Sequence, residues 1–180
     1  MTTAQTLVQA AFSPYEVPAP FQTIEAFSWI TDDGAWPFGD CNLSPPNDNI
    51  LNYWVGSAAK AARLKEQIKV WLHGPNGYLY AFWSYDGRPM LEAPIVYLDD
   101  EGDGSAVVAN DLDEFLSIAA HGFCRIKHDG LEPCPDELPS SPEAFFTARH
   151  ITPTPDWAQR MSAARDAHPD FEAWLDELLS

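Results

Sequence analysis

The densest group of side chains that could do chemistry is the acidic turn at residues 99–104, Asp-Asp-Glu-Gly-Asp-Gly. In a calcium loop, Asp99, Glu101 and Asp103 would supply the first, third and fifth ligands, and Gly104 would take the sharp turn. The twelfth position, which needs a bidentate Glu, is Asn110, and the flanking segments are typical of strands instead of helices. We therefore predict no metal here. Of the remaining alternatives, a solvated hairpin turn and an acidic loop that contacts another protein, we favour the second.

Histidine and cysteine side chains form a second candidate site. His121, Cys124, His128 and Cys134 follow one another with the spacing H-x2-C-x3-H-x5-C. That spacing matches no common structural zinc site, and buried free cysteines are common in proteins. The chain also lacks a nucleophile elbow, a Walker-type phosphate loop, a dinucleotide fingerprint and a helical His-Glu-x-x-His motif. We predict that the protein has no catalytic residue, no metal and no cofactor, and that it is not an enzyme.

Charge is the strongest global property of the chain. It carries 27 acidic and 10 basic residues, which gives a formal net charge of −17. Such a surface repels nucleic acids and anionic membranes and attracts basic proteins, although acidity can also serve solubility alone. Residues 86–114 hold nine acidic side chains and one base, Arg88, so we expect one acidic face there and a small basic patch at residues 60–69. The predicted partner-binding residues are Asp99, Asp100, Glu101, Asp103, Asp111, Asp113 and Glu114.

The elements that would position these residues begin with a predicted sheet. Two runs rich in β-branched and aromatic residues, 69–73 and 78–85, are joined by Gly-Pro-Asn-Gly, which is a hairpin signal. Further strands are predicted at 94–98 and 105–109, on either side of the acidic turn. We expect the Trp and Tyr side chains of the hairpin to lie in the core and not to form a binding surface.

Two helices are predicted around the sheet. Residues 54–67 are rich in Ala with interleaved charges, which favours a helix. Residues 111–122 have complete end signals: Asp111 as N-cap, Glu114 as its capping-box partner and Gly122 as the stop. The side chains expected to face the sheet from this second helix are Leu112, Phe115, Leu116 and Ala119.

The two ends of the chain differ in character. Prolines punctuate the first 50 residues, so any helix there must be short, and residues 21–30 are the best candidate. Residues 129–155 are predicted to be a proline-rich connection with a short helix at 144–148. Residues 156–180 are predicted to be a C-terminal helical extension of two helices broken at His168-Pro169. Its expected buried positions are Trp157, Met161, Ala164, Phe171, Trp174, Leu175 and Leu178.

Composition bounds the organisation of the chain. A length of 180 residues with 46% hydrophobic residues is typical of a single folded domain over residues 1–180. No run approaches the roughly 18 apolar residues that span a bilayer, and the N-terminal segment lacks the basic start of a secretory signal. Three cysteines cannot all pair with one another, so we expect a reducing cytoplasm.

Residues 68–122 carry a resemblance to a known family. The segments KVWLHG, NGYLYAFWS, APIVYLDDEGDG, VVA and DLDEFLSIAAHG follow one another in an order that resembles the SUKH superfamily, whose founding members include a yeast regulator of cell-wall synthesis. The resemblance covers about a third of the chain and rests on order and spacing, not on a single motif. It implies an α+β fold with a central, mostly antiparallel sheet, helices packed around it and, here, added C-terminal helices. It also implies protein binding without enzymatic activity, since bacterial members are mostly immunity proteins that neutralise toxins such as nucleases or deaminases.

We therefore expect an immunity protein of a polymorphic toxin system, which binds a basic toxin domain by stoichiometric occlusion and engages neither nucleic acid nor membrane. One alternative is a regulatory protein-binding scaffold like the yeast relative. A second alternative, from another class, is a metal-dependent hydrolase that uses the acidic cluster from Asp99 to Asp103.

Overall fold

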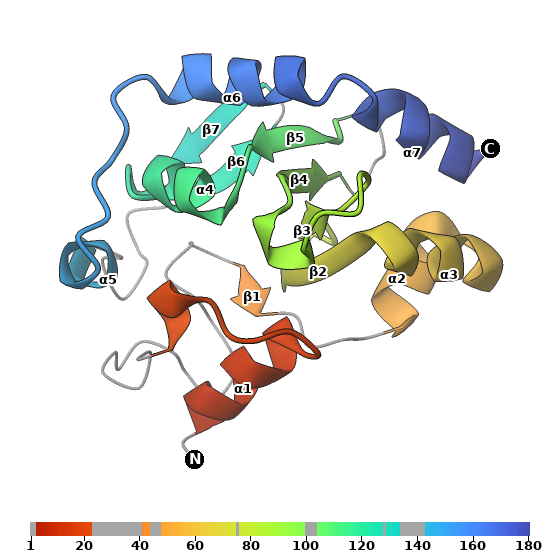
Figure 1. Cartoon of the computed structure of the whole chain (residues 1–180), viewed down its shortest axis with the longest axis horizontal. Coiled ribbons are helices and arrows are strands. Elements are labelled where there is room, and N and C mark those ends of the chain that lie inside the picture. Colours follow the sequence, from red (N-terminus) through yellow and green to blue (C-terminus); the bar gives the residue numbers. More distant parts are fainter. Residues whose placement is uncertain are drawn as a thin grey trace.

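The computed structural model describes residues 3–22, 41–43, 48–74, 76–99, 104–127, 129–133 and 143–180. Its centre is an antiparallel sheet of five strands in chain order (Figure 1). The strands are β1 (Asn42–Leu43), β2 (Ile68–His73), β3 (Leu79–Trp83), β4 (Ile95–Leu98) and β5 (Ala106–Ala109). Helices surround the sheet, so the predicted α+β fold with C-terminal helices is confirmed.

The predicted hairpin is confirmed as the pair β2 and β3. Ile68 lies opposite Trp83 and His73 lies opposite Leu79. Between the strands, the Gly77 amide donates to the Gly74 carbonyl at 3.1 Å, and Gly77 has a φ of 93°. An L-residue with a side chain rarely adopts that angle, so the Asn-Gly sequence suits the turn. The strands predicted at 94–98 and 105–109 are β4 and β5, which also pair antiparallel.

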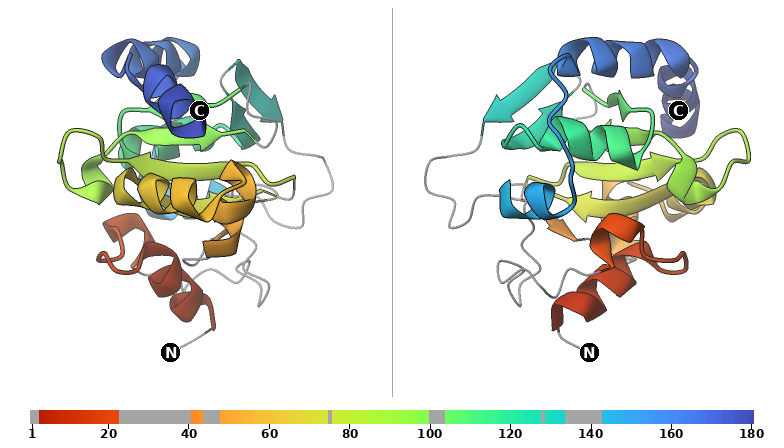
Figure 2. Two further views of the ribbon diagram at one scale, coloured as in Figure 1. Left: turned by 90° about the vertical axis from the view of Figure 1, so that its right-hand side faces the viewer. Right: turned by 60° about the vertical axis from the view of Figure 1, so that its left-hand side comes forward.

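Both faces of the sheet are buried, and successive residues alternate between two cores because side chains in a strand alternate faces. In β3, Tyr80 and Phe82 join one core, whereas Leu79, Ala81 and Trp83 join the other. The first core lies under α1 (Thr3–Phe12) and α4 (Leu112–Ala119). The second lies under α2 (Asp48–Val55), α3 (Ala58–Gln67) and α7 (Phe171–Leu179). Figure 2 shows α2 and α3 in front of the sheet in one view and α4 in front in the other.

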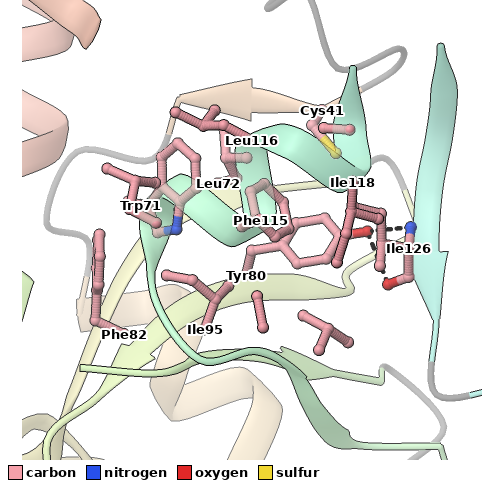
Figure 3. Close-up of a cluster of buried hydrophobic side chains, with 14 of the residues drawn as sticks. Cys41, Trp71, Leu72, Tyr80, Phe82, Ile95, Phe115, Leu116, Ile118 and Ile126 are labelled. Atoms are coloured by element: carbon pink, nitrogen blue, oxygen red, sulfur yellow. Dashed lines mark hydrogen bonds between the residues drawn. The ribbon is translucent and has the colours of Figure 1, made fainter. Parts of the chain in front are cut away.

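A bulge in β2 explains why two adjacent large side chains enter the same core. The register with β3 shifts between Val70 and Leu72, so Trp71 lies at the irregularity. A bulge inserts one residue and breaks the alternation of faces. Trp71 and Leu72 therefore both join the core that contains Phe115, whose ring centroid lies 5.7 Å from that of Trp71 (Figure 3).

Helix α4 begins and ends close to the predicted residues. Asp111 is the N-cap, and its Oδ1 accepts from the Glu114 amide at 2.8 Å. Glu114 reaches back in turn to the Asn110 amide at 2.7 Å, one residue earlier than in the usual capping box. Gly122, which follows the helix, has a φ of 81°. The predicted buried stripe is confirmed at Leu112, Phe115, Leu116 and Ala119.

The single helix predicted over residues 54–67 is wrong in its extent, because the structure divides this region into α2 and α3. Gly56, with a φ of 66°, ends α2. Ser57 has extended backbone angles and caps α3, accepting from the Lys60 amide at 3.5 Å. A small residue with a positive φ followed by a hydroxyl cap separates two helices even where the flanking residues favour one.

The N-terminal segment contains a helix that the sequence analysis did not predict, α1, and a short 3-10 helix over residues 19–21. Phe12 and Phe21 from this segment stack at 5.3 Å in the core beside Trp71. Most of the helix predicted over residues 21–30 lies outside the described residues.

The C-terminal part contains α5 (Glu143–Ala148), α6 (Trp157–Ala167) and α7 (Phe171–Leu179), as predicted. Five of the seven predicted positions are buried, and Trp157 and Trp174 are half-buried. A second, two-stranded sheet was not predicted: β6 (Phe123–Lys127) pairs with β7 (Gly130–Pro133), and β7 lies within residues 129–155, which were expected to be a connection. None of the helices in the described parts of the chain is long and apolar enough to cross a membrane.

Candidate functional site

Asp99, the first residue of the acidic turn, is held by contacts within the molecule. Its side chain is only 20% exposed and lies 3.6 Å from the Arg125 guanidinium. The Tyr97 hydroxyl donates to its Oδ1 at 3.1 Å, and its amide donates to Ser105 Oγ at 2.9 Å. Asp99 therefore organises the start of the turn and has little side chain left for a partner. Asp100, Glu101 and Asp103, the other predicted contacts in this turn, lie outside the described residues.

Arg125 links the small sheet to the large one. Its guanidinium lies 4.0 Å from the Tyr78 ring centroid and 5.4 Å from that of Tyr97, and it donates to the Tyr97 hydroxyl. Burial raises the pKa of Tyr97, so that hydroxyl stays neutral. The Tyr80 hydroxyl also joins the two sheets, since it accepts from the Ile126 amide at 2.7 Å and donates to the Ile126 carbonyl at 3.1 Å (Figure 3). These contacts place β6 against the large sheet.

The three predicted contact residues at the start of α4 differ in accessibility. Asp111 and Asp113 are exposed. The Glu114 side chain is only 10% exposed, because it caps the helix and lies 3.5 Å from Arg160. Asp111 and Asp113 are therefore the two of these carboxylates that a partner can reach.

The possible zinc ligands are only partly described. The Nε2 of His121 donates to the Thr154 carbonyl at 2.5 Å, which ties α4 to the segment before α6. His128 and Cys134 lie outside the described residues. Within the described ranges, no group of three or more His, Cys, Asp and Glu residues could hold a metal ion.

An open pocket of about 400 Å³ lies between α2 and the turn of the β2–β3 hairpin. Its helical wall is formed by Asn49, Ile50, Tyr53 and Trp54. The opposite wall is formed by the hairpin residues His73, Gly74, Gly77 and Leu79. The pocket thus combines aromatic and aliphatic surface with a single imidazole.

Tyr53 is the most exposed large hydrophobic residue among those described, at 90%, and the next is Tyr15 at 39%. Leu51 and Val55 of the same helix are buried in the core, so Tyr53, two residues from each, is carried to the outer side of α2. Tyrosine anchors many protein interfaces because its ring offers a large apolar area with few rotatable bonds. Tyr53 therefore gives the pocket a rim that suits a protein partner.

Trp54 connects the pocket to the acidic turn. Its indole N–H donates to the Asp99 carbonyl at 2.8 Å, so the half-buried ring is fixed between α2 and the end of β4.

His73 is half-buried, and its Nδ1 is a buried atom without a hydrogen-bond partner among the described residues. Burial lowers the pKa of His73, so its imidazole is neutral at pH 7 and one ring nitrogen is an acceptor.

Gly74, in the hairpin wall of the pocket, is required by a close contact. A Cβ at Gly74 would lie 2.0 Å from Tyr78 Cζ, well inside the van der Waals distance. Tyr78 cannot easily move away, because its ring is fully buried under Arg125 and its hydroxyl lies 3.3 Å from the Cys41 thiol. Gly74 therefore allows the hairpin turn to lie directly on the aromatic core.

Sequence reasoning did not single out this pocket. The expectation that the hairpin aromatics are core residues is confirmed at Trp71, Tyr78, Tyr80 and Trp83. Tyr53 stood before the region predicted as a helix, so its position was not considered. The spacing of Leu51 and Val55, four residues apart, was the available signal, because it places Tyr53 away from the core if residues 48–55 form a helix.

Comparison with known proteins gives no match: no protein-family model fits the chain, and no curated protein or solved structure is significantly similar to it.

Proposed function

We propose that this protein is an immunity protein that binds a basic toxin domain and blocks it by stoichiometric occlusion. The observation that carries the binding role is Tyr53, a residue that is 90% exposed at the rim of a pocket, in a chain with a net charge of −17. The resemblance of residues 68–122 to the SUKH superfamily supports the immunity role.

The two features have separate physical tasks in the proposal. The net negative charge speeds the encounter with a basic partner and disfavours partners of the same sign. The pocket beside Tyr53 holds the partner once the two molecules meet, because desolvated aromatic contacts contribute most to slow dissociation. Asp111 and Asp113, which are exposed, are proposed to contact the basic partner.

The test is protection of a sensitive bacterial strain. The chain is co-expressed with the product of the neighbouring reading frame, and survival, complex formation and stoichiometry are measured. We expect survival and a one-to-one complex by size-exclusion chromatography with light scattering. Loss of viability with no detectable complex would contradict the immunity role.

A second test addresses the proposal that the protein does not act as a metal-dependent enzyme. A metal that binds the folded state must raise the melting temperature. We expect no increase on addition of calcium, magnesium or zinc, and no hydrolysis of nucleic acid, phosphate ester or carboxylic ester substrates. Turnover that disappears in Glu101→Gln without unfolding would contradict this proposal.

A further inference from the structure

We infer that the pocket between α2 and the β2–β3 turn binds an arginine side chain of the partner protein, with the guanidinium against Tyr53 and Trp54. This inference rests on the proposed function, because it assumes that the partner is a basic protein. It adds the location of the recognition site and the residue type that enters it.

The shape of the pocket favours a protein side chain over a free small molecule. A volume of about 400 Å³ is at the lower end of the range for small-molecule sites, roughly 300–1,000 Å³. Such sites usually enclose most of their ligand. Here one wall is Tyr53, which is 90% exposed, so a small ligand would leave most of that ring in water. A protein surface that covers Tyr53 while one of its side chains enters the pocket would desolvate both.

The chemistry of the walls selects the side chain. Tyr53 and Trp54 provide ring faces, which attract cations through their quadrupoles and on which a planar guanidinium can stack. A partner carboxylate would be repelled by these ring faces and would approach a protein of net charge −17. The aromatic lining and the overall charge therefore both favour a cation.

Arginine is favoured over lysine for a geometric reason. Lysine presents a compact, strongly hydrated ammonium, which loses more hydration free energy when it enters an aromatic pocket. The guanidinium is weakly hydrated and planar, so it can keep one face on a ring while the N–H groups in its plane stay available to water or to the partner. Tyr53 and Trp54 are neighbouring residues of α2 that line the pocket, and they provide the rings.

The experiment is an NMR titration of the full ¹⁵N-labelled chain with the peptide acetyl-Gly-Arg-Gly-amide in physiological salt. Lysine and citrulline versions of the peptide are the chemical controls, since citrulline keeps the shape and loses the charge. Tyr53→Ala is the test variant, and its folding should be preserved because the residue is exposed. Tyr15→Ala, which truncates the other exposed aromatic residue, is the matched control.

We expect saturable shifts confined to the amides of α2 and the β2–β3 turn with the arginine peptide. Tyr53→Ala should weaken binding about threefold to tenfold, as expected for loss of one cation–π contact, and Tyr15→Ala should leave it unchanged. Equal binding of the citrulline or lysine peptide, or equal binding of the arginine peptide to Tyr53→Ala, would overturn the inference.

If the wild type and Tyr53→Ala protect cells and bind the toxin equally well, the pocket inference fails while the immunity role stands. If the peptide binds in the pocket and no toxin is neutralised, the immunity role fails instead.

Discussion

Lys69 and Gly74 lie near the two ends of strand β2, and the residue type at each position is constrained by one close contact. Lys69 is buried, and its ammonium donates to the Ser13 carbonyl at 2.7 Å, which ties β2 to the end of α1. Gly74 lies against the ring of Tyr78. At the residue scale, both positions lead to predictions about stability.

Lys69 should make the stability of the protein depend on pH in the alkaline range. Burial lowers the pKa of Lys69 to about 8, from 10.5 in its unperturbed state. Between these values the unfolded chain binds a proton that the folded chain has lost, so stability rises with pH across this window. The shift corresponds to up to about 3 kcal/mol. From pH 8 to pH 10, we expect the unfolding free energy of the wild type to increase relative to that of Lys69→Met.

The measurement is urea denaturation at several pH values. Lys65→Met, which changes an exposed lysine on the adjacent helix α3, is the control and should show no such dependence. A difference between wild type and Lys69→Met that stays constant with pH would contradict the buried position of the ammonium.

Gly74→Ala should destabilise the protein because the new methyl group has no room beside Tyr78. Overpacking of a buried site typically costs about 1–3 kcal/mol. Gly56→Ala is the control, because nothing lies within 4 Å of the added Cβ and only the positive φ of 66° is strained. Urea denaturation and the near-ultraviolet circular dichroism of the buried tyrosines measure the effect. If Gly74→Ala costs less than Gly56→Ala, Gly74 and Tyr78 are not in close contact.

At the scale of elements, the position of each helix depends on which core its apolar face joins. Helix α4 lies against the core that contains Trp71 and Tyr80, and Phe115 is its central contact. The Phe115 ring lies 5.2 Å from that of Tyr80 in an edge-to-face arrangement. This helix also presents the exposed residues Asp111 and Asp113, so its packing positions part of the proposed acidic surface.

Phe115→Ala should therefore cost about 3–5 kcal/mol of unfolding free energy, the usual cost of truncating a buried aromatic side chain. Asp113→Ala on the exposed side of the same helix is the control and should cost less than about 1 kcal/mol. Urea denaturation measures both. If Phe115→Ala does not fold, Phe115→Leu, which leaves a smaller cavity, provides a measurable intermediate. A near-zero effect of both Phe115 variants would contradict the packing of α4.

At the scale of the whole molecule, the distribution of surface charge depends on which basic side chains are engaged in contacts within the protein. Lys60 donates to the Leu179 carbonyl, and Arg63 lies 3.6 Å from Glu177. Arg125 lies beside Asp99, and Arg160 lies beside Glu114. The basic segment at residues 60–69 thus contacts α7 and the end of α1 and does not present a wholly free patch. The excess of acidic residues is therefore weakly offset at the surface, which favours fast association with a basic protein.

Association with the toxin partner should slow steeply with salt. Screening lengths fall from about 30 Å at 0.01 M ionic strength to about 8 Å near 0.15 M. The triple variant Asp100→Asn, Glu101→Gln, Asp103→Asn should associate more slowly at low salt with an unchanged melting temperature. It leaves Asp99 intact, because that residue contacts Arg125 within the protein.

The control for this prediction changes three exposed acidic residues of α6 and α7: Asp166→Asn, Glu172→Gln and Asp176→Asn. It alters net charge by the same amount at a different place. Surface plasmon resonance over a range of salt concentrations measures both rate constants. Equal effects of the two triple variants would show that net charge alone governs association. Binding by the first variant at the wild-type rate would mean that the acidic turn contributes nothing to the encounter.

The amino-acid sequence by itself determined the local features of this protein whose signals lie within a few residues. The hairpin at Gly74–Gly77, the cap of α4 at Asp111 and the break at His168 follow from backbone preferences that need no distant partner. The nearly continuous apolar strands are consistent with burial of both faces of the sheet, which the sequence analysis did not predict. Only the tertiary structure decided which residues from distant parts of the chain meet. It brought Asp99 to Arg125, and it placed Tyr53 and Trp54 in one pocket with His73, because contacts between residues far apart in the chain depend on the packing of whole elements.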